Sequence, residues 1–434
     1  MKIYKNSFNY LDYFFFLLFP FSFVIGVGAV EVFSFLLIIY LFKKADKFFY
    51  KKYYIFIYIF LIFYSYFLFR SLIFSLDFEK IKSILFYFRF ALFTLGFIFF
   101  LEKFRFDNKL ILKVIYFSFL ILIADAIFQY FYGQNIIGLK LYHIERASGF
   151  FGKELILGSF LFRFLPFLFL ILILFKLNIK KNIIYLSIFF GFYYFGIFIS
   201  GERTSFALLI MAIVLLFFLF KDFRKVIALS LILFSFLILV TYFFKKEGVE
   251  RMFITTMQQI KVDVAPNLLE SNSNLSNLNI NKSKYYIFSR DHHGHYVVAI
   301  RMFLDNPIIG QGPRSFRYLC SEEKFIKADG ICTTHPHNTY LQLLAETGLI
   351  GFLLFCSLII FFTKEIVTKF ITQLKNDENK MNQMEKVKYV SIIAILVNFF
   401  PFVPSGNFFN NWLSFICYYP LSFYLYSINK LHIK

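Results

Sequence analysis

Charged residues are scarce in this chain. They make up 17% of its 434 residues, whereas 59% of the residues are hydrophobic, and the mean hydropathy is +0.68. A soluble globular domain carries roughly a quarter charged residues and cannot hide this much apolar surface. The shortage of charge therefore excludes a soluble protein and indicates a chain whose solvent is a lipid bilayer.

Several patterns that would indicate other protein classes are absent. The apolar segment 11–33 follows two lysines as in a signal peptide, but neither a small-residue cleavage site nor a soluble mature domain comes after it. No HExxH zinc pattern occurs, and GQGPRSF at 310–316 is not a GxGxxG fingerprint after a strand. We expect a tight turn there and no nucleotide site.

Long apolar runs fill most of the chain. A segment needs roughly 20 mostly apolar residues to cross about 30 Å of hydrocarbon. We therefore predict an all-α polytopic integral membrane protein with about 12 transmembrane helices, at 10–27, 28–42, 53–74, 84–101, 109–132, 154–175, 182–200, 203–220, 226–244, 340–363, 388–405 and 408–429.

The formal charge of +20 does not indicate a nucleic-acid partner, because the Lys and Arg residues lie in short clusters between the apolar runs. Positive residues are retained on the cytoplasmic side of a membrane. Far more of them fall in the connections on the side of the two termini than in the other connections. The pattern predicts cytoplasmic N- and C-termini and contacts with membrane lipids.

The same alternation places one large loop, residues 245–339, outside the cytoplasm between helices 9 and 10. We divide the chain into helices 1–9 over 1–244, this loop, and helices 10–12 over 340–434. The Asn/Ser-rich stretch within 264–284 has little to bury, so we expect it to be mobile. An amphipathic helix is expected over 296–304. Cys320 and Cys332 share this loop, and a disulfide between them is expected if the loop is extracytoplasmic.

His337 lies in the densest polar constellation, TTHPHNTYLQLLAETGLIG at 333–351. Pro336 holds the preceding residue out of helical geometry, and Asn338 or Thr339 is a good N-cap for the helix that follows. A neutral imidazole at such a helix start can act as a general base. The alternative is that His337 is only a polar residue at the membrane surface.

Arginines flank the predicted outer helix ends. Arg203 lies in ISGERTSF, Arg146 in ERASGFFGKE and Arg89 near the outer end of the fourth span. Guanidinium groups bind phosphate oxygens in bidentate fashion, so together these three could clamp a diphosphate. The alternative for Arg203 is a simple interfacial pair with Glu202.

The second half of the loop is rich in candidate side chains. Three histidines beside Asp291 suggest zinc, but their i, i+1, i+3 spacing does not by itself place three ligands around one ion, so we expect no metal and no cofactor. Arg301, Arg314 and Asn338 are counted as substrate-binding candidates. Gly348 and Gly351 lie one turn apart, and we expect them to allow close helix packing.

These motifs resemble the O-antigen ligases and related bacterial membrane glycan ligases and polymerases. The likeness rests on HN, nine residues, G, two residues, G, here His337-Asn338 through Gly348 and Gly351, on SGERTSF, on DNPIIGQGPRSF, and on the long loop between helices 9 and 10. The motifs cover roughly residues 200–360.

The resemblance implies a metal-independent, inverting glycosyltransferase of the bacterial inner membrane. It would move a glycan from undecaprenyl diphosphate to a hydroxyl of lipid A-core at the periplasmic face, with His337 as base and Arg203 and Arg290 at the positions of the family's essential arginines. An O-antigen repeat-unit polymerase and a protein O-oligosaccharyltransferase are the alternatives within this class. A polysaccharide or lipid transporter is the rival outside it, although the chain shows no internal repeat.

Overall fold

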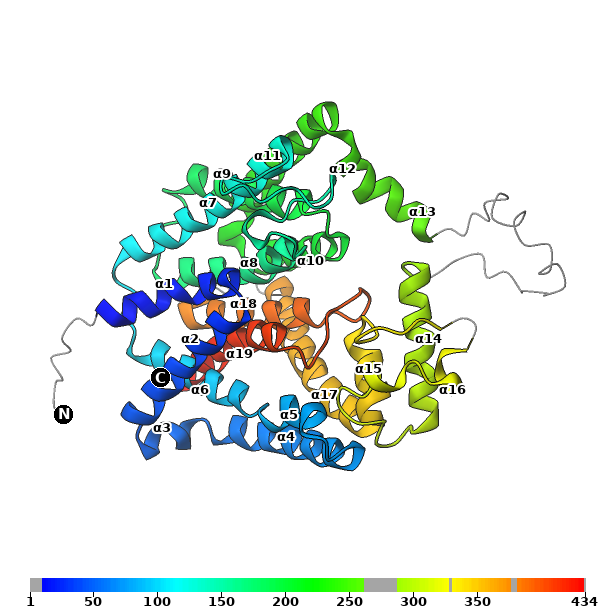
Figure 1. The fold of residues 1–434 in the computed structure, drawn as a ribbon. Helices are drawn as coiled ribbons and strands as arrows, with labels where there is room; N and C mark the ends of the chain where they lie inside the picture. Colours follow the sequence, from blue (N-terminus) through cyan, green and yellow to red (C-terminus); the bar gives the residue numbers. More distant parts are fainter. Residues whose placement is uncertain (1–9, 261–286, 328–329, 376–380, 433–434) are drawn as a thin grey trace, which may run out of the picture.

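The protein is helical throughout the part that the structure describes. The computed structural model describes residues 10–260, 287–327, 330–375 and 381–432 (Figure 1), and no strand occurs within these ranges. The helices are α1 Tyr10–Ile25, α2 Val27–Lys44, α3 Lys47–Lys52, α4 Tyr54–Phe74, α5 Phe78–Leu85, α6 Arg89–Lys103, α7 Lys109–Tyr132, η1 Gly149–Phe151, α8 Leu157–Leu174, α9 Ile183–Ile199, α10 Arg203–Leu219, η2 Lys221–Phe223, α11 Arg224–Phe244, α12 Lys246–Glu250, η3 Arg251–Thr255, α13 Thr256–Ile260, α14 Arg290–Asp305, α15 Phe316–Leu319, α16 Glu323–Ile326, α17 Thr339–Lys375, α18 Gln383–Asn398 and α19 Asn411–His432.

Each of the twelve predicted spans overlaps a helix of the structure, with the fourth span formed by α5 and α6 together. Among the residues that the structure describes, six helices are long and apolar enough to cross a membrane by length and composition. The chain is thus a multi-pass membrane protein, while the number of twelve crossings stays a prediction. Helix α17 contains the span predicted at 340–363 and continues beyond it to Lys375.

Polar capping residues define where several helices begin and end. Asn108 accepts a hydrogen bond from the N–H of Leu110 at the start of α7, and Gly133 ends that helix with φ 84°. Asn382 and Glu385 form a capping box at the start of α18. These caps satisfy backbone groups at helix ends that hydrocarbon could not.

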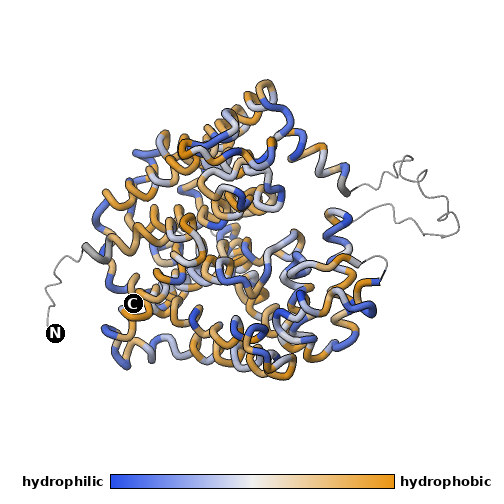
Figure 2. Tube along the Cα trace, viewed as in Figure 1, coloured by the Kyte–Doolittle hydropathy of each residue, from blue (hydrophilic) through white to orange (hydrophobic). Residues whose placement is uncertain are grey.

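The helices pack around α8, of which nearly every residue is buried. Figure 2 shows hydrophobic residues along the long helices and hydrophilic residues gathered at bends and around α12–α16. The core is largely aromatic: Phe164 of α8 stacks on Tyr419 of α19 with ring centroids 5.5 Å apart. Aromatic pairs of this kind add to the dispersion contacts that hold membrane helices together.

The bundle has two distinct ends. The start of α1 and the end of α19 lie at the left of Figure 1, whereas α14–α16 and the start of α17 lie at the right. We call the end that carries α14–α16 the loop end. The helix ends nearest the termini thus lie at the opposite end of the bundle from α14–α16.

A second, smaller core lies inside the loop end. Val298 and Met302 of α14 pack with Phe316, Phe325 and the buried face of α17. The amphipathic helix predicted at 296–304 is confirmed and is longer, running as α14 from Arg290 to Asp305. The stretch 264–284 lies outside the described residues.

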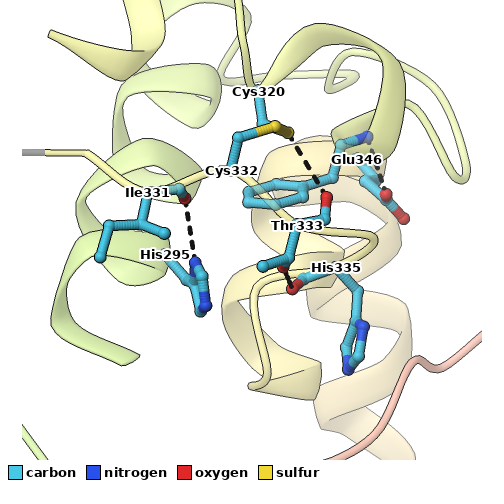
Figure 3. Close-up of a disulfide and its surroundings, with 8 residues drawn as sticks. His295, Cys320, Ile331, Cys332, Thr333, His335 and Glu346 are labelled. Carbon is cyan, nitrogen blue, oxygen red and sulfur yellow. Dashed lines mark hydrogen bonds between the residues drawn. A yellow bond between two sulfur atoms is a disulfide. The ribbon is translucent and has the colours of Figure 1, made fainter. Parts of the chain in front are cut away.

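A disulfide joins Cys320 and Cys332 within this small core (Figure 3), with Cα atoms 5.2 Å apart. Cys320 is fully buried. The bridge joins the end of α15 to the segment that leads into His335 and His337.

Helix α17 is broken at Gly348, which has φ 62° and ψ −167°. Segment 307–312 replaces the lost helical hydrogen bonds: the N–H groups of Gln311 and Gly312 donate to the carbonyls of Ala345 and Glu346, and the N–H of Leu349 donates to Pro307. Arg70 of α4, which is buried, donates through Nε to the carbonyl of Ile309 at 2.8 Å. The expectation of simple helix packing for Gly348 is therefore wrong, since the residue breaks the helix to receive this segment.

Candidate active site

His337 lies directly before the first turn of α17, in a backbone conformation that few non-glycine residues adopt (φ 55°). Asn338 is the N-cap: its Oδ1 accepts from the N–H groups of Tyr340 and Leu341 at 3.0 and 3.1 Å. Pro336 does not extend α17 toward the N-terminus. His337 therefore lies in a turn of fixed backbone conformation directly before the helix.

The loop between α18 and α19 fixes this turn from the other side. The N–H of Ser405 donates to the carbonyl of His337 at 2.8 Å, and the Ser405 hydroxyl accepts from the N–H of Thr339 at 2.7 Å. Asn338 donates through Nδ2 to the carbonyl of Pro401 at 3.0 Å. Backbone strain persists where surrounding bonds hold it in this way, and it is common at functional sites.

Three other histidine rings surround the His337 ring. Its centroid lies 4.1 Å from that of His335, 5.3 Å from that of His295 and 5.5 Å from that of His292. Two of these neighbours come from α14 and one from the segment before α17. Residues more than 40 positions apart in sequence thus form one cluster, which we call the histidine cluster (His292, His295, His335 and His337).

The orientation of the cluster follows from bonds to its outer members. His295 Nδ1 donates to the carbonyl of Ile331 at 2.9 Å, so its Nε2 is left as an acceptor. His292 Nδ1 lies 2.8 Å from the hydroxyl of Ser289, the N-cap of α14. Figure 3 shows the rings of His295 and His335 both directed away from the disulfide.

Burial favours the neutral forms of His337 and His335. It lowers the pKa of His337 to about 4, with additional contributions from His292 and His295. Burial also lowers the pKa of His335 to about 3, with His337 as the next cause. Since charged imidazoles so close together repel each other and are poorly solvated, His337 is neutral at pH 7 and able to accept a proton.

Arginines gather beside the ends of α9 and α10. Arg146 donates through Nε to the carbonyl of Ser200 at 3.3 Å and through Nη2 to that of Leu155 at 3.2 Å. Arg251 donates to the carbonyl of Gly201 at 3.3 Å and pairs with Glu145 at 3.2 Å. Arg203 lies within electrostatic range of both arginines. We call Arg146, Arg203 and Arg251 the arginine cluster.

The two clusters are in electrostatic contact. The pKa of His292 is lowered first by burial, then by His295, and also by the positive charge of Arg203. Arg203, at the start of α10, is therefore within electrostatic range of His292 on α14.

Glu202, the residue before Arg203, links α10 to the start of α8 through hydrogen bonds. Its carboxylate accepts from the N–H of Gly158 at 2.7 Å and from that of Ser159 at 3.1 Å, which caps the start of α8. Burial raises the pKa of Glu202. Its hydrogen bonds therefore tie α8 to α10, and they locate Arg203 at the first position of α10.

The remaining predicted site residues lie in different surroundings. Arg290 is the first residue of α14 and is exposed, two positions from His292. Arg89 pairs with Glu31 of α2 at 3.2 Å. Arg301 donates to the carbonyls of Phe325 and Ile326 at the end of α16, and Arg314 to the hydroxyl of Ser83. The structure thus brings Arg203 and Arg146 together, with Arg203 within electrostatic range of His292, and it gives Arg89, Arg301 and Arg314 other partners.

The sequence analysis did not predict two residues of the site, Arg251 and Ser405. Arg251 lies just after the predicted ninth span, and a count of positive charge at that boundary would have found it. Ser405 lies in PSG at 404–406, and nothing in its local sequence connects it with His337. Among the residues that the structure describes, no group of three or more His, Cys, Asp or Glu has the geometry of a metal site.

Comparison with known proteins bears on this geometry. Residues 186–356 match the family model described as O-Antigen ligase; this range contains Arg203, Arg251, the whole histidine cluster and the break at Gly348. No curated protein matches the chain. The family comprises membrane enzymes that transfer lipid-linked glycans. The resemblance expected from the motifs is confirmed over residues 186–356, where the chain is similar to the O-antigen ligases.

Proposed function

We propose that this protein transfers a glycan from an undecaprenyl diphosphate-linked donor to a hydroxyl of lipid A-core, at the periplasmic face of the bacterial inner membrane. One observation supports the proposal: a half-buried, neutral His337 is held at a helix start and packs against His292, which is within electrostatic range of Arg203 of the arginine cluster. His337 supplies a general base, and the arginine cluster supplies positive charge. The proposed transfer requires both.

In the proposed reaction the acceptor hydroxyl oxygen forms a bond to the anomeric carbon of the donor sugar. The bond from that carbon to the diphosphate oxygen breaks, and the diphosphate leaves with the bonding electron pair. His337 takes the proton of the attacking hydroxyl. Attack opposite the leaving group inverts the anomeric configuration.

The arginine cluster supports this step electrostatically. Arg203, Arg146 and Arg251 would face the negative charge that grows on the departing diphosphate, and partly buried guanidinium groups stabilise such charge more than exposed ones. These fixed charges can do this work without a metal ion, so we propose a metal-independent reaction. Arg290, exposed two residues from His292, would meet the donor or the acceptor as it enters.

The test uses purified protein with lipid-linked polysaccharide and lipid A-core, with products separated by gel. We expect a single transfer of polysaccharide to the core. Ladder-like growth without the core would instead identify a polymerase, and sugar attached to an added protein would identify a protein O-oligosaccharyltransferase. Movement of the lipid-linked glycan between the leaflets of a vesicle without covalent transfer would identify a transporter.

A further inference from the structure

The start of α15 leaves buried polar atoms without hydrogen-bond partners. Within the described residues, Arg314 Nε, Ser315 Oγ and Arg317 Nε are buried and unpaired. His335 Nε2, in the histidine cluster, is a fourth such atom. Buried polar groups normally have partners, because an unmade hydrogen bond in the interior is costly. Three unpaired atoms in four successive residues therefore indicate the place of a ligand.

The unpaired atoms share one region of the loop end. The disulfide joins the end of α15 to the segment that carries His335. The pKa of Arg314 is lowered first by burial and next by the positive charge of Arg317. After burial and His337, the charge of Arg317 also lowers the pKa of His335. Arg317 is thus within electrostatic range of both Arg314 and His335.

The backbone holds the two arginines in fixed positions. Arg314 has φ 63°, a conformation that few non-glycine residues adopt. The N–H of Ser315 donates to the carbonyl of Gly312 at 3.1 Å, and the N–H of Phe316 donates to Glu346 Oε1 at 3.0 Å. Such strain persists where surrounding bonds hold it, and it is common where a ligand binds.

The nearby carboxylate of Glu346 does not pair with either arginine. Glu346 is fully buried and within electrostatic range of Arg314 and Arg317. Its two oxygens accept instead from the N–H of Phe316 and, at 3.0 Å, from Nε2 of Gln342. Within the described residues no ion pair to Arg314 or Arg317 is recorded, so their positive charge is available to an anion.

The chemistry of the group favours phosphate as that anion. Lys80 of α5 adds a third positive charge beside α15, since its Nζ lies 5.4 Å from the ring centroid of Tyr318. Guanidinium groups match phosphate oxygens in bidentate fashion, and a hydroxyl such as that of Ser315 can donate to a third oxygen. A phosphate monoester carries nearly two negative charges above pH 7, because its second pKa is about 6.

Positive charge reaches the histidine cluster from two different helices. Arg203 of α10 is within electrostatic range of His292, and Arg317 of α15 is within range of His335. The His335 ring lies 4.1 Å from that of His337. The arginine cluster is the proposed site of the donor diphosphate, so an anion beside α15 would belong to the other substrate.

We propose that Arg314, Ser315 and Arg317 bind a phosphate monoester carried by the acceptor. The choice of a phosphate comes from the unpaired donors and the uncompensated charge. Its assignment to the acceptor rests on the proposed function. The phosphate would then hold the acceptor with its reactive hydroxyl at His337.

Binding of glucose 6-phosphate to the purified full-length protein in detergent micelles at pH 8 tests the phosphate site. Glucose, which lacks the phosphate, is the control ligand. We expect glucose 6-phosphate to bind at least about tenfold more tightly than glucose. Arg317→Gln should remove this advantage, Arg317→Lys should keep part of it, and Arg203→Gln should leave it intact.

Equal affinity for glucose would overturn the phosphate site. Loss of the advantage in Arg203→Gln but not in Arg317→Gln would place the phosphate in the arginine cluster and overturn the role of α15. Displacement of the probe by dioleoyl phosphatidic acid at equal concentration would assign the site to a phospholipid headgroup and overturn the acceptor. If Arg317→Gln has a lowered melting temperature, Ser315→Ala and Arg317→Lys supply the comparison, and wild-type affinity in both would overturn the site.

Transfer kinetics test the assignment to the acceptor. Arg317→Gln should raise the KM for phosphorylated lipid A-core at least about tenfold, with kcat and the KM for the donor near their wild-type values. Enzymatic removal of the phosphate monoesters from the acceptor should abolish this difference between variant and wild type. A raised KM for the donor instead would overturn the assignment. Absence of transfer by the wild type would contradict the proposed function and leave the binding result unaffected.

Discussion

The ring of His295 stacks on the ring of His337, with centroids 5.3 Å apart and an interplanar angle of 29°. His295 is itself fixed by its bond to the carbonyl of Ile331, the residue before Cys332 of the disulfide. The position and the pKa of His337 therefore depend on the folded loop end as well as on the helix that it starts.

The pH dependence of the transfer rate should reflect the lowered pKa of His337. With the His337 pKa lowered to about 4, kcat/KM should stay near its plateau at pH 6 and fall only as the pH approaches 4, where His337 becomes protonated. In His292→Gln one cause of the lowered pKa is removed, so the acid limb should move to higher pH. An acid limb near pH 6.5 in the wild type would show that the pKa of the general base is not lowered.

The same histidines should make the fold sensitive to acid. The folded-state pKa values of His335 and His337 are about 3 and about 4, below the roughly 6.5 of an unfolded histidine. Their contribution to stability is thus fully present above pH 6.5 and is lost as the pH falls through these lower values. Melting temperatures in micelles should decrease from pH 7 to pH 4, and His335→Gln should reduce that dependence. An equal decrease of the melting temperature with pH in the wild type and in His335→Gln would contradict this prediction.

Gly348 should be among the least replaceable residues of the chain. A Cβ added there would lie 2.4 Å from the carbonyl oxygen of Ile308 and would require φ +62° of an alanine. We expect Gly348→Ala to cost about 3 to 5 kcal/mol of stability, measured by unfolding in micelles. Gly28→Ala is the matched control, because nothing lies within 4 Å of the added Cβ. Equal stability of the two variants would mean that segment 307–312 does not pack into the break.

The disulfide should stabilise the loop end. Cys320 and Cys332 are separated by 12 residues, and closing a loop of that size is worth about 2 to 3 kcal/mol. A reductant should lower the melting temperature of the wild type, and the double exchange of both cysteines to serine should abolish this response, whereas Cys356→Ser should not. Alkylation of both thiols without reductant would rule the bridge out.

The arginine cluster should act on the donor. Arg203→Gln and Arg251→Gln should each lower kcat/KM by about 100-fold if these groups stabilise the leaving diphosphate. Arg203→Lys should have a kcat/KM between those of Arg203→Gln and the wild type, because a lysine cannot form the bidentate contact. Arg105→Gln, an exposed change, is the control. Wild-type kinetics of Arg203→Gln would remove this cluster from the mechanism.

The sequence predicted the helices well because each apolar run is a local signal: α7, predicted at 109–132, occupies Lys109–Tyr132. It also offered Asn338 or Thr339 as the N-cap of α17, and the structure selects Asn338. The break at Gly348 was missed because it depends on Gly310, which lies 38 residues earlier and packs against it. The histidine cluster was missed for the same reason, since α14 is brought to His337 only by tertiary packing.

The central claim is that His337 is the general base, and the rate of glycan transfer by His337→Gln tests it most directly. The purified variant should transfer glycan about 100- to 10,000-fold more slowly than the wild type, with the same melting temperature at pH 8, while His143→Gln, which changes an exposed histidine, should retain the wild-type rate. A His337→Gln protein that transfers glycan at the wild-type rate would contradict the account.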